Sequence, residues 1–206
     1  MRISSISSVF LFLAALALTG VVAHAQTDIG LSVYGAFNGT SNGNGTAQSP
    51  ANAAGGIVEL RHISNPFVGY EATYSYNRAN QSYRAFSTTC PVGSATPCPL
   101  HVSANAHEVT ADWIASVHIA NLRPFALAGV GLLLDVPAGN QSLTNTTAKP
   151  VFVYGAGLDW SLIAHLGLRF QYRGNLYKAP DLTTLYTSTN KFTHTAEPMI
   201  GAYLRF

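Results

Sequence analysis

The chain has 206 residues, of which 48% are hydrophobic and only 10% are charged, and its formal net charge is +2. Soluble domains carry about 25% charged residues, so contact with water alone does not explain the surface of this protein. Acids and bases nearly balance, which excludes the strongly charged composition typical of proteins that bind nucleic acid or acidic partners. The length suits a single domain.

The first segment has the layout of a secretory signal peptide. Arg2 precedes an apolar stretch at residues 9–22, and the small residues Ala23 and Ala25 follow. This pattern predicts cleavage after Ala25. A retained membrane anchor is the alternative, but the apolar stretch is shorter than the ~20 residues that span a bilayer as a helix. The expected division is a signal peptide at residues 1–25 and one mature domain at residues 26–206.

After residue 26 the chain alternates apolar residues with polar or small ones, which is the pattern of half-buried β-strands. The stretch at 67–77, for example, places Tyr70 and Tyr74 on one face and Glu71 and Thr73 on the other. Six segments alternate clearly, at residues 28–37, 67–77, 107–117, 151–161, 166–173 and 197–206. Two further strands are expected at 54–62 and 123–135, and the second has no decisive parity.

These segments have the length and spacing of a membrane barrel. A strand of about 10 residues crosses a bilayer at a tilt, and lipid tolerates only helices and closed barrels. Long connections at 38–53, 78–103, 136–149 and 177–192 alternate with short ones at 63–66, 118–121 and 163–165. The sequence therefore predicts an all-β fold, an eight-stranded antiparallel up-and-down transmembrane β-barrel in the bacterial outer membrane, with both termini periplasmic and the long loops extracellular.

A soluble barrel with an apolar interior is the alternative, and three features oppose it. The apolar face is rich in aromatic residues near strand ends, the opposite face mixes charges with glycines, and the chain finishes on an apolar-face aromatic residue. Aromatic girdles at the two interfaces are typical of membrane barrels. The girdle candidates are Tyr70, Trp113, Trp160, Tyr172 and Phe206.

The mature chain resembles the OmpA-like and OmpX-like barrels of Gram-negative bacteria. The stretch VYGAGLDWSL at 153–162 is similar to a strand that recurs in those families, and GLRFQYRGNLYKAPDL with THTAEPMIGAYLRF resembles the last two strands of a small acidobacterial barrel family. The resemblance implies outer-membrane lipids and the barrel assembly machinery as partners, and a monomer. The residues that resemble the assembly signal are Ile200, Ala202, Leu204 and Phe206.

The same parity predicts a charged lumen. The residues expected there are Glu59, Arg61, Glu71, Glu108, Asp112, Asp159, Arg169, Arg173, Glu197 and Arg205. Because side chains fill an eight-stranded barrel, we expect these charges to pair as a plug and not to line an open pore. A narrow conduit whose ion pairs rearrange is the alternative.

Two cysteines, Cys90 and Cys98, lie in the longest loop. A disulfide between them is the default in an oxidising compartment, and a redox or metal role is the alternative. The histidines His62, His118 and His165 fall in or beside the three short turns, where we expect them to be solvated and not metal ligands.

Three functions remain open at this stage. The first is a non-enzymatic structural or surface-interaction protein that works through its long, polar, mobile loops. The second is a narrow conduit for small solutes. The third is a lipid-modifying enzyme, suggested by His194, Thr195 and Glu197, although the serine of such a site is missing and His194 and Glu197 have opposite parity. We expect no catalytic residue, cofactor or metal.

Overall fold

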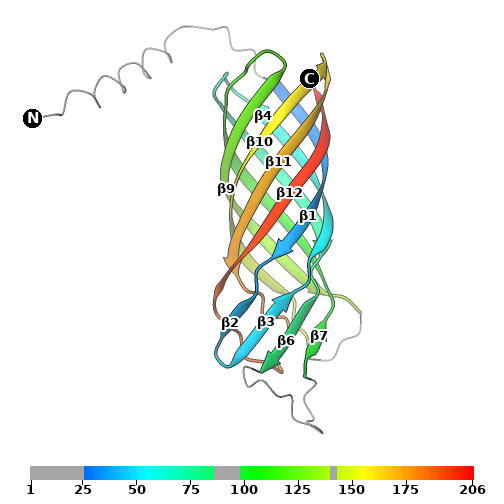
Figure 1. The fold of residues 1–206 in the computed structure, drawn as a ribbon, viewed down its shortest axis with the longest axis vertical. Helices are drawn as coiled ribbons and strands as arrows, with labels where there is room; N and C mark the ends of the chain where they lie inside the picture. The colour runs from blue at the N-terminus through cyan, green and yellow to red at the C-terminus, as the bar shows by residue number, and fades with distance from the viewer. Residues whose placement is uncertain (1–25, 86–97, 140–142) are drawn as a thin grey trace, which may run out of the picture.

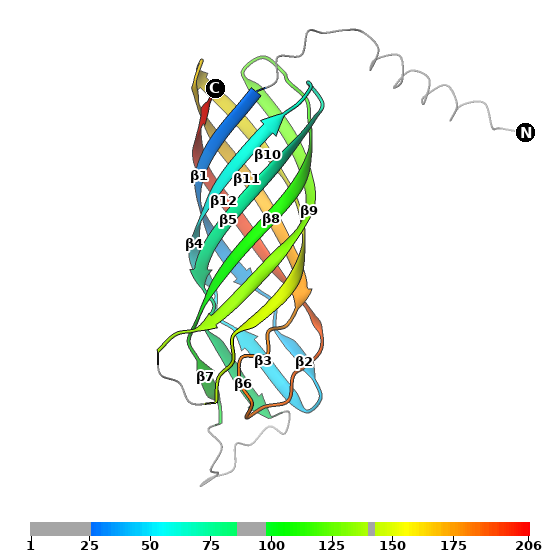
Figure 2. The ribbon, with the colours of Figure 1, turned by 180° about the vertical axis from the view of Figure 1, so that it is seen from behind.

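The computed structural model describes residues 26–85, 98–139 and 143–206. Eight antiparallel strands form a closed barrel (Figures 1 and 2). They are β1 (Gln26–Asn38), β4 (Ala53–Ile63), β5 (Val68–Arg78), β8 (Ala104–Ser116), β9 (Leu122–Pro137), β10 (Thr147–Ile163), β11 (Leu166–Lys178) and β12 (Phe192–Arg205). The predicted fold class is confirmed, and each of the eight expected strands corresponds to one of these. The expected signal peptide at residues 1–25 lies outside the described residues.

Each strand of the barrel pairs with its neighbours in the chain, and the last strand closes on the first. The order around the barrel is β1-β12-β11-β10-β9-β8-β5-β4. The closing pair runs from Asp28 opposite Arg205 to Asn38 opposite Thr195. Closure pairs the backbone groups of β1 and β12 and leaves no free sheet edge, which is the condition for β-structure in lipid.

The outer face of the barrel is apolar and the inner face is polar, the reverse of a soluble protein. Leu31 is 65% exposed and Trp113 is 70% exposed, whereas Glu59, between the outward-facing Val58 and Leu60, is fully buried. Within the described part of the chain, no helix is long and apolar enough to cross a membrane.

The side chains of strand β9 alternate between the inner and the outer face of the barrel, although the hydropathy of its sequence does not show which residues point inward. Arg123, Phe125 and Asp135 point inward, while Val130 and Leu132 are exposed on the outer face. Apolar residues such as Leu127 also occupy inward positions of this strand, so apolar side chains stand on both faces. The alternation in hydropathy is therefore lost although the alternation in direction is kept.

A second sheet stands beyond the barrel, at the end away from the chain's C-terminus (Figures 1 and 2). It has the order β2-β3-β6-β7, formed by β2 (Ser41–Gly43), β3 (Thr46–Pro50), β6 (Gln81–Ala85) and β7 (Leu100–Val102). Asn44 and Gly45 join β2 to β3 with positive φ angles of 49° and 76°, which is the backbone of a type I′ hairpin turn. We call this sheet, with residues 179–191, the cap.

The expectation of solvated loops is wrong for the strands of the cap within 38–53 and 78–103. Gln48, Tyr83 and Val102 in the cap are at most 2% exposed. Gln48 Nε2 donates to the carbonyl oxygen of Pro180 at 2.9 Å, and the hydroxyl of Tyr83 donates to the same oxygen at 3.1 Å. The polar side chains are buried with hydrogen-bond partners because the last long loop supplies those partners.

Candidate functional site

The centre of the barrel is filled by three arginines whose side chains have no exposed surface. Arg169 on β11 contacts four carboxylates from four strands. Its Nε donates to Asp159 Oδ1 at 2.8 Å and its Nη2 to Asp28 Oδ1 at 2.9 Å, and its Nη1 lies 3.4 Å from Glu59 Oε2. The same Nη1 lies 3.6 Å from Glu71 Oε2. One guanidinium therefore connects β11 to β10 and to the strands β1, β4 and β5.

Arg61 and Arg173 extend this cluster along the barrel. Arg61 Nη2 lies 2.7 Å from Glu71 Oε2, and its Nη1 lies 3.0 Å from Asp159 Oδ2. Arg173 Nη1 lies 3.3 Å from Asp112 Oδ2. Multiple carboxylate contacts of this kind suit the fixed fork of donors on a guanidinium. We call Arg61, Arg169, Arg173 and the carboxylates within 4.0 Å of them the plug.

The plug also uses an aromatic ring. The Cζ atom of Arg61 lies 4.1 Å from the centroid of the Phe125 ring, which is close enough for a cation–π interaction. Phe125 comes from β9, which carries no plug carboxylate and contributes a ring instead. The cross-section of the lumen is filled by side chains at this level, as expected for an eight-stranded barrel.

Nine of the ten residues expected in the lumen are at most 4% exposed. The exception is Arg205, which is half-buried at the rim because it is the last residue of β12, and donates to the hydroxyl of Tyr203 at 3.1 Å. Among the described residues no acid lies within ion-pair distance of Arg205, so it is not part of the plug. Glu197 is buried but lies apart from the plug, nearer the cap.

Three buried charges are missing from the expected set: Asp28, Arg123 and Asp135. Asp28 has the same parity as Ser32, an inward residue of the same strand. Arg123 and Asp135 stand at opposite ends of one strand with the same parity. Because these two positions are an even number of residues apart, both side chains lie on the same face of the strand. Two charges on one face indicate that this face of 123–135 points inward, even where hydropathy does not.

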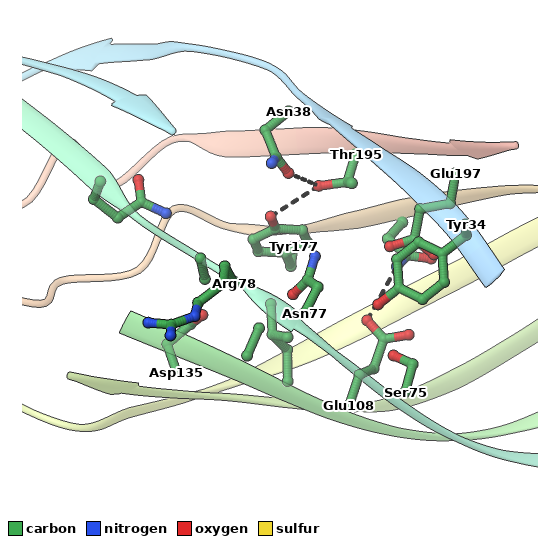
Figure 3. A pocket seen from close by; sticks show the side chains of 15 residues that line it. Tyr34, Asn38, Ser75, Asn77, Arg78, Glu108, Asp135, Tyr177, Thr195 and Glu197 are labelled. Carbon is green, nitrogen blue, oxygen red and sulfur yellow. Dashed lines mark hydrogen bonds between the residues drawn. The ribbon is translucent and has the colours of Figure 1, made fainter. Parts of the chain in front are cut away.

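Between the plug and the cap lies a polar cavity of about 30 Å³, which we call the upper-lumen cavity (Figure 3). Its wall carries the carboxylates of Glu108, Asp135 and Glu197. Asn175 Nδ2 donates to Glu108 Oε2 at 3.0 Å, and the hydroxyls of Tyr177 and Thr195 are 2.9 Å apart. The space suits one or two water-sized species and not a larger solute.

The cap covers this end of the barrel with its own buried contacts. The backbone N–H of Leu182 donates to the hydroxyl of Tyr83 at 3.2 Å, and Leu182 is fully buried. Burial raises the pKa of Tyr83, because the phenolate form would be desolvated. The lumen thus holds the charges of the plug at its centre and apolar and hydroxyl groups beside the cap.

The turn histidines do not converge. His62 Nδ1 lies 2.9 Å from Thr27 Oγ1, and His165 Nδ1 lies 3.0 Å from the carbonyl oxygen of Arg205. Burial lowers the pKa of His118, and the nearby positive charge of Arg123 acts in the same direction. In the described ranges, no group of three or more His, Cys, Asp or Glu side chains is placed to hold a metal ion.

The residues of the suggested esterase site lie on two faces of the barrel. His194 is on the outer face, where its Nε2 lies 2.9 Å from the hydroxyl of Tyr154. Glu197 and Thr195 are buried on the inner face. A base and a carboxylate separated by the barrel wall cannot act on one substrate atom.

Only one cysteine of the predicted disulfide, Cys98, lies among the described residues. Cys98 is not a free thiol. Cys90 lies outside the described residues, so the pairing of the two remains a prediction.

No protein-family model matches this chain. No curated protein matches it either. The more specific likeness of its last two strands to an acidobacterial family is therefore unsupported.

Several solved structures are similar to this chain. The outer membrane protein OprG from Pseudomonas aeruginosa has a TM-score of 0.63 at 11% identity, over 89% of this chain and 97% of that chain. Neisserial surface protein A has a TM-score of 0.56 at 15% identity, over 89% and 99%. Ail, the attachment invasion locus protein of Yersinia pestis, solved with the heparin analogue sucrose octasulfate, has 0.54 at 14% identity, over 89% and 99%. These likenesses show the fold: the chain is an eight-stranded transmembrane β-barrel of the outer-membrane type.

Proposed function

We propose that the protein is a non-enzymatic, non-conducting barrel of the bacterial outer membrane that presents its cap to the cell exterior as an interaction surface. In this proposal residues 1–25 are removed on export, the mature domain is 26–206, and both termini are periplasmic. The signal at Ile200, Ala202, Leu204 and Phe206 directs assembly, and Cys90 pairs with Cys98 beside the cap.

The plug carries the non-conducting part of the proposal. Arg61, Arg169 and Arg173 have no exposed side-chain surface, and each bridges at least two carboxylates. Moving one guanidinium to open a path would leave several buried carboxylates without a partner, which is strongly unfavourable. The narrow conduit is for this reason the weaker candidate.

The surface-interaction part is supported by how charge is divided between the two faces of the barrel wall. Eight of the nine acids are buried and the ninth, Asp181, is half-buried, so no carboxylate side chain is fully exposed. The exposed bases stand at the cap end: Arg78, Arg84, Lys178 and Lys191. Although the net charge of the chain is near zero, these four bases form a cationic cap rim. Such a rim suits an anionic polysaccharide as partner. Ail, with the same fold, was solved with an anionic sugar.

Conductance in a planar bilayer tests the plug. We expect insertion of the purified protein without discrete openings, and we expect the charge-neutral variant Arg61→Ala/Glu71→Ala to conduct because it removes two plug side chains together. The rim variant Arg205→Ala should remain closed. Discrete ohmic openings of the unsubstituted protein would contradict the non-conducting barrel and favour the narrow conduit.

Retention on immobilised heparin tests the cap rim. The unsubstituted protein in detergent should bind and elute with rising salt, because screening weakens contacts between exposed charges. The variant Arg84→Gln/Lys178→Gln/Lys191→Gln should elute at clearly lower salt, whereas Arg205→Gln, at the other end of the barrel, should not. Equal elution of both variants would contradict the assignment of the cap rim.

A further inference from the structure

The cap sheet turns a row of three polar side chains away from the last long loop. Ser49 on β3 lies directly opposite Ser82 on β6, and Ser82 lies directly opposite His101 on β7. Directly opposite residues of antiparallel strands share a face, with Cβ atoms about 5 Å apart. Gln48, the neighbour of Ser49 in the chain, contacts Pro180, so the row is on the other face of the sheet.

This row lines a groove of about 330 Å³, which we call the cap groove. The strands that form it, β3, β6 and β7, lie side by side at the end of the barrel (Figure 1). The volume is at the lower end of the range of about 300–1,000 Å³ for small-molecule pockets. The groove therefore has room for a ligand of one or two small rings.

The side chains of the row can both donate and accept hydrogen bonds. A serine hydroxyl does both, and so does a neutral imidazole. No hydrogen bond joins the side chains of Ser49, Ser82 and His101 to any other residue that the structure describes. Asn80, which also lines the groove, accepts the backbone N–H of Ala104 at its Oδ1 and keeps its amide N–H groups as further donors. The wall thus offers a set of groups that match alcohols.

The rest of the wall excludes a bulky apolar ligand. Ala51 and Val102 are small, and no phenylalanine, tyrosine, tryptophan or leucine is among the described residues that line the groove. Gln81 also lines it, although its Oε1 accepts from Gln48 on the other face of the sheet. A sugar ring suits this wall, because its hydroxyls match the polar row and its C–H groups can cover Ala51 and Val102.

The charge beside the groove is positive. Arg84 is exposed, and it follows Ser82 by two positions on β6, so both side chains are on the same face. Among the described residues that line the groove there is no Asp or Glu. An acidic group on the sugar would therefore meet a cation and no like charge.

An extended peptide is the other kind of ligand for a sheet of this type. A peptide strand binds by backbone hydrogen bonds to the edge of a sheet. Strand β7 is at the edge of the cap sheet but has only three residues, so a peptide paired with it would gain few such bonds. The sugar is for this reason the better match.

We propose that the cap groove binds a sugar residue with an acidic group, a uronic acid or a sulfated hexose, as part of a surface polysaccharide. Ser49, Ser82 and His101 bond its hydroxyls, and Arg84 faces its acidic group. This inference rests on the proposed function, in which the cap faces the cell exterior, and it names the recognition site that the cap adds to its charged rim.

Fluorescence anisotropy of a labelled heparin tetrasaccharide tests the groove in the protein purified in detergent. The variant Ser49→Ala/Ser82→Ala removes two hydroxyls and no charge, and we expect its affinity to fall about tenfold, the effect of two lost hydrogen bonds. Thr187→Ala, an exposed hydroxyl of the cap outside the groove, is the matched control and should bind as tightly as the unsubstituted protein. Ala51→Phe, at an exposed position, fills the groove and should abolish saturable binding at low occupancy of the rim; it replaces the double variant if that one does not fold.

The dependence on salt separates the groove from the rim. Ser49→Ala/Ser82→Ala should bind more weakly at every salt concentration with an unchanged salt dependence, because no charge is removed. Lys178→Gln/Lys191→Gln should instead make binding less dependent on salt. Free glucuronate and glucose 6-sulfate should compete better than glucose, and their relative potency identifies which acidic group the groove prefers. This preference over glucose should be lost in Arg84→Gln.

Three results would overturn the proposal. The first is equal affinity of Ser49→Ala/Ser82→Ala and Thr187→Ala, which would leave the cationic rim as the only binding surface. The second is equal competition by glucose and glucuronate in the unsubstituted protein, which would exclude an acidic ligand in the groove. The third is competition by an uncharged extended peptide and not by glucuronate. Retention on immobilised heparin is measured separately, so a groove that fails while retention persists leaves the proposed function in place, and loss of both refutes both.

Discussion

Replacing Arg169 with methionine removes the plug residue that joins the most strands. Methionine keeps much of the side-chain volume, so the substitution changes charge and hydrogen bonding more than packing. It deprives Asp28, Glu59 and Asp159 of a cation within 3.4 Å. Asp28 loses its ion-pair partner altogether, since Arg169 is the only base within 4.0 Å of it among the described residues.

The expected cost follows from the number of carboxylates left behind. Breaking a single buried ion pair by removing one partner costs about 3–5 kcal/mol, because the other charge stays buried without compensation. Four carboxylates share Arg169, and Arg61 still contacts two of them, Asp159 and Glu71. We therefore expect the free energy of unfolding to fall by about 4 kcal/mol or more. Arg169→Lys should cost less, since it keeps the charge and loses only the fork geometry.

Denaturant unfolding in lipid vesicles measures this change through the fluorescence of the two tryptophans, Trp113 and Trp160, which face outward. Arg205→Met, at the rim, is the matched control and should cost under about 1 kcal/mol. Adding Asp28→Asn to Arg169→Met should recover about 1–3 kcal/mol relative to the sum of the single changes, because the two residues are in contact. A cost of Arg169→Met no larger than that of Arg205→Met would refute the view that the plug stabilises the barrel.

Two further predictions concern the wall and the end of the barrel. Gly129→Ala should destabilise the protein by about 1–3 kcal/mol, because its Cβ would collide with Asp112 Oδ1 and the carbonyl oxygen of Ala111. Gly56→Ala should change stability by no more than about 0.5 kcal/mol, because its Cβ meets only Ser32 O at 3.9 Å. Denaturant unfolding of the two variants measures the difference, and equal costs would contradict the close approach at Gly129. Phe206→Ala should lower the yield of folded protein in the outer membrane several-fold while changing the unfolding free energy by about 1 kcal/mol or less. Phe192→Ala is its control, because both rings are 72% exposed but only Phe206 belongs to the proposed assembly signal, so equal yields would argue against that signal.

The sequence reveals the barrel where the inner face is polar and conceals it where that face is apolar. Strand β5 sets Glu71 and Thr73 against Tyr70 and Tyr74, and its parity is plain from two-residue periodicity. Strand β9 buries Phe125 and other apolar side chains against the arginines of the plug, so hydropathy gives no parity there. Arg123 and Asp135 lie on this strand, and the sequence pattern does not place them in the lumen because hydropathy does not identify its inward face.

The cap could not be predicted from local pattern. Its strands are three to five residues long and carry Ser, Asn, Thr and Gln, which read as loop. The pairing of Thr46–Pro50 with Gln81–Ala85 joins segments more than 30 residues apart, and the partner of Gln48 is Pro180. The first long loop has three Asn-Gly pairs, each a local hairpin signal, and only the pair at Asn44 and Gly45 forms the β2–β3 turn.

The division of basic residues explains how a barrel with a charged centre holds together and still offers a charged surface. The chain has three lysines, Lys149, Lys178 and Lys191, and all stand at the cap end. The deep lumen uses arginine alone, because one planar guanidinium can satisfy carboxylates on several strands at once, which a lysine ammonium does less well. The acids drawn inward by this arrangement outnumber the arginines, and the surplus lies in the upper-lumen cavity beside Asp135. The buried ion pairs of the plug and the cationic cap rim are thus two consequences of one distribution of charge.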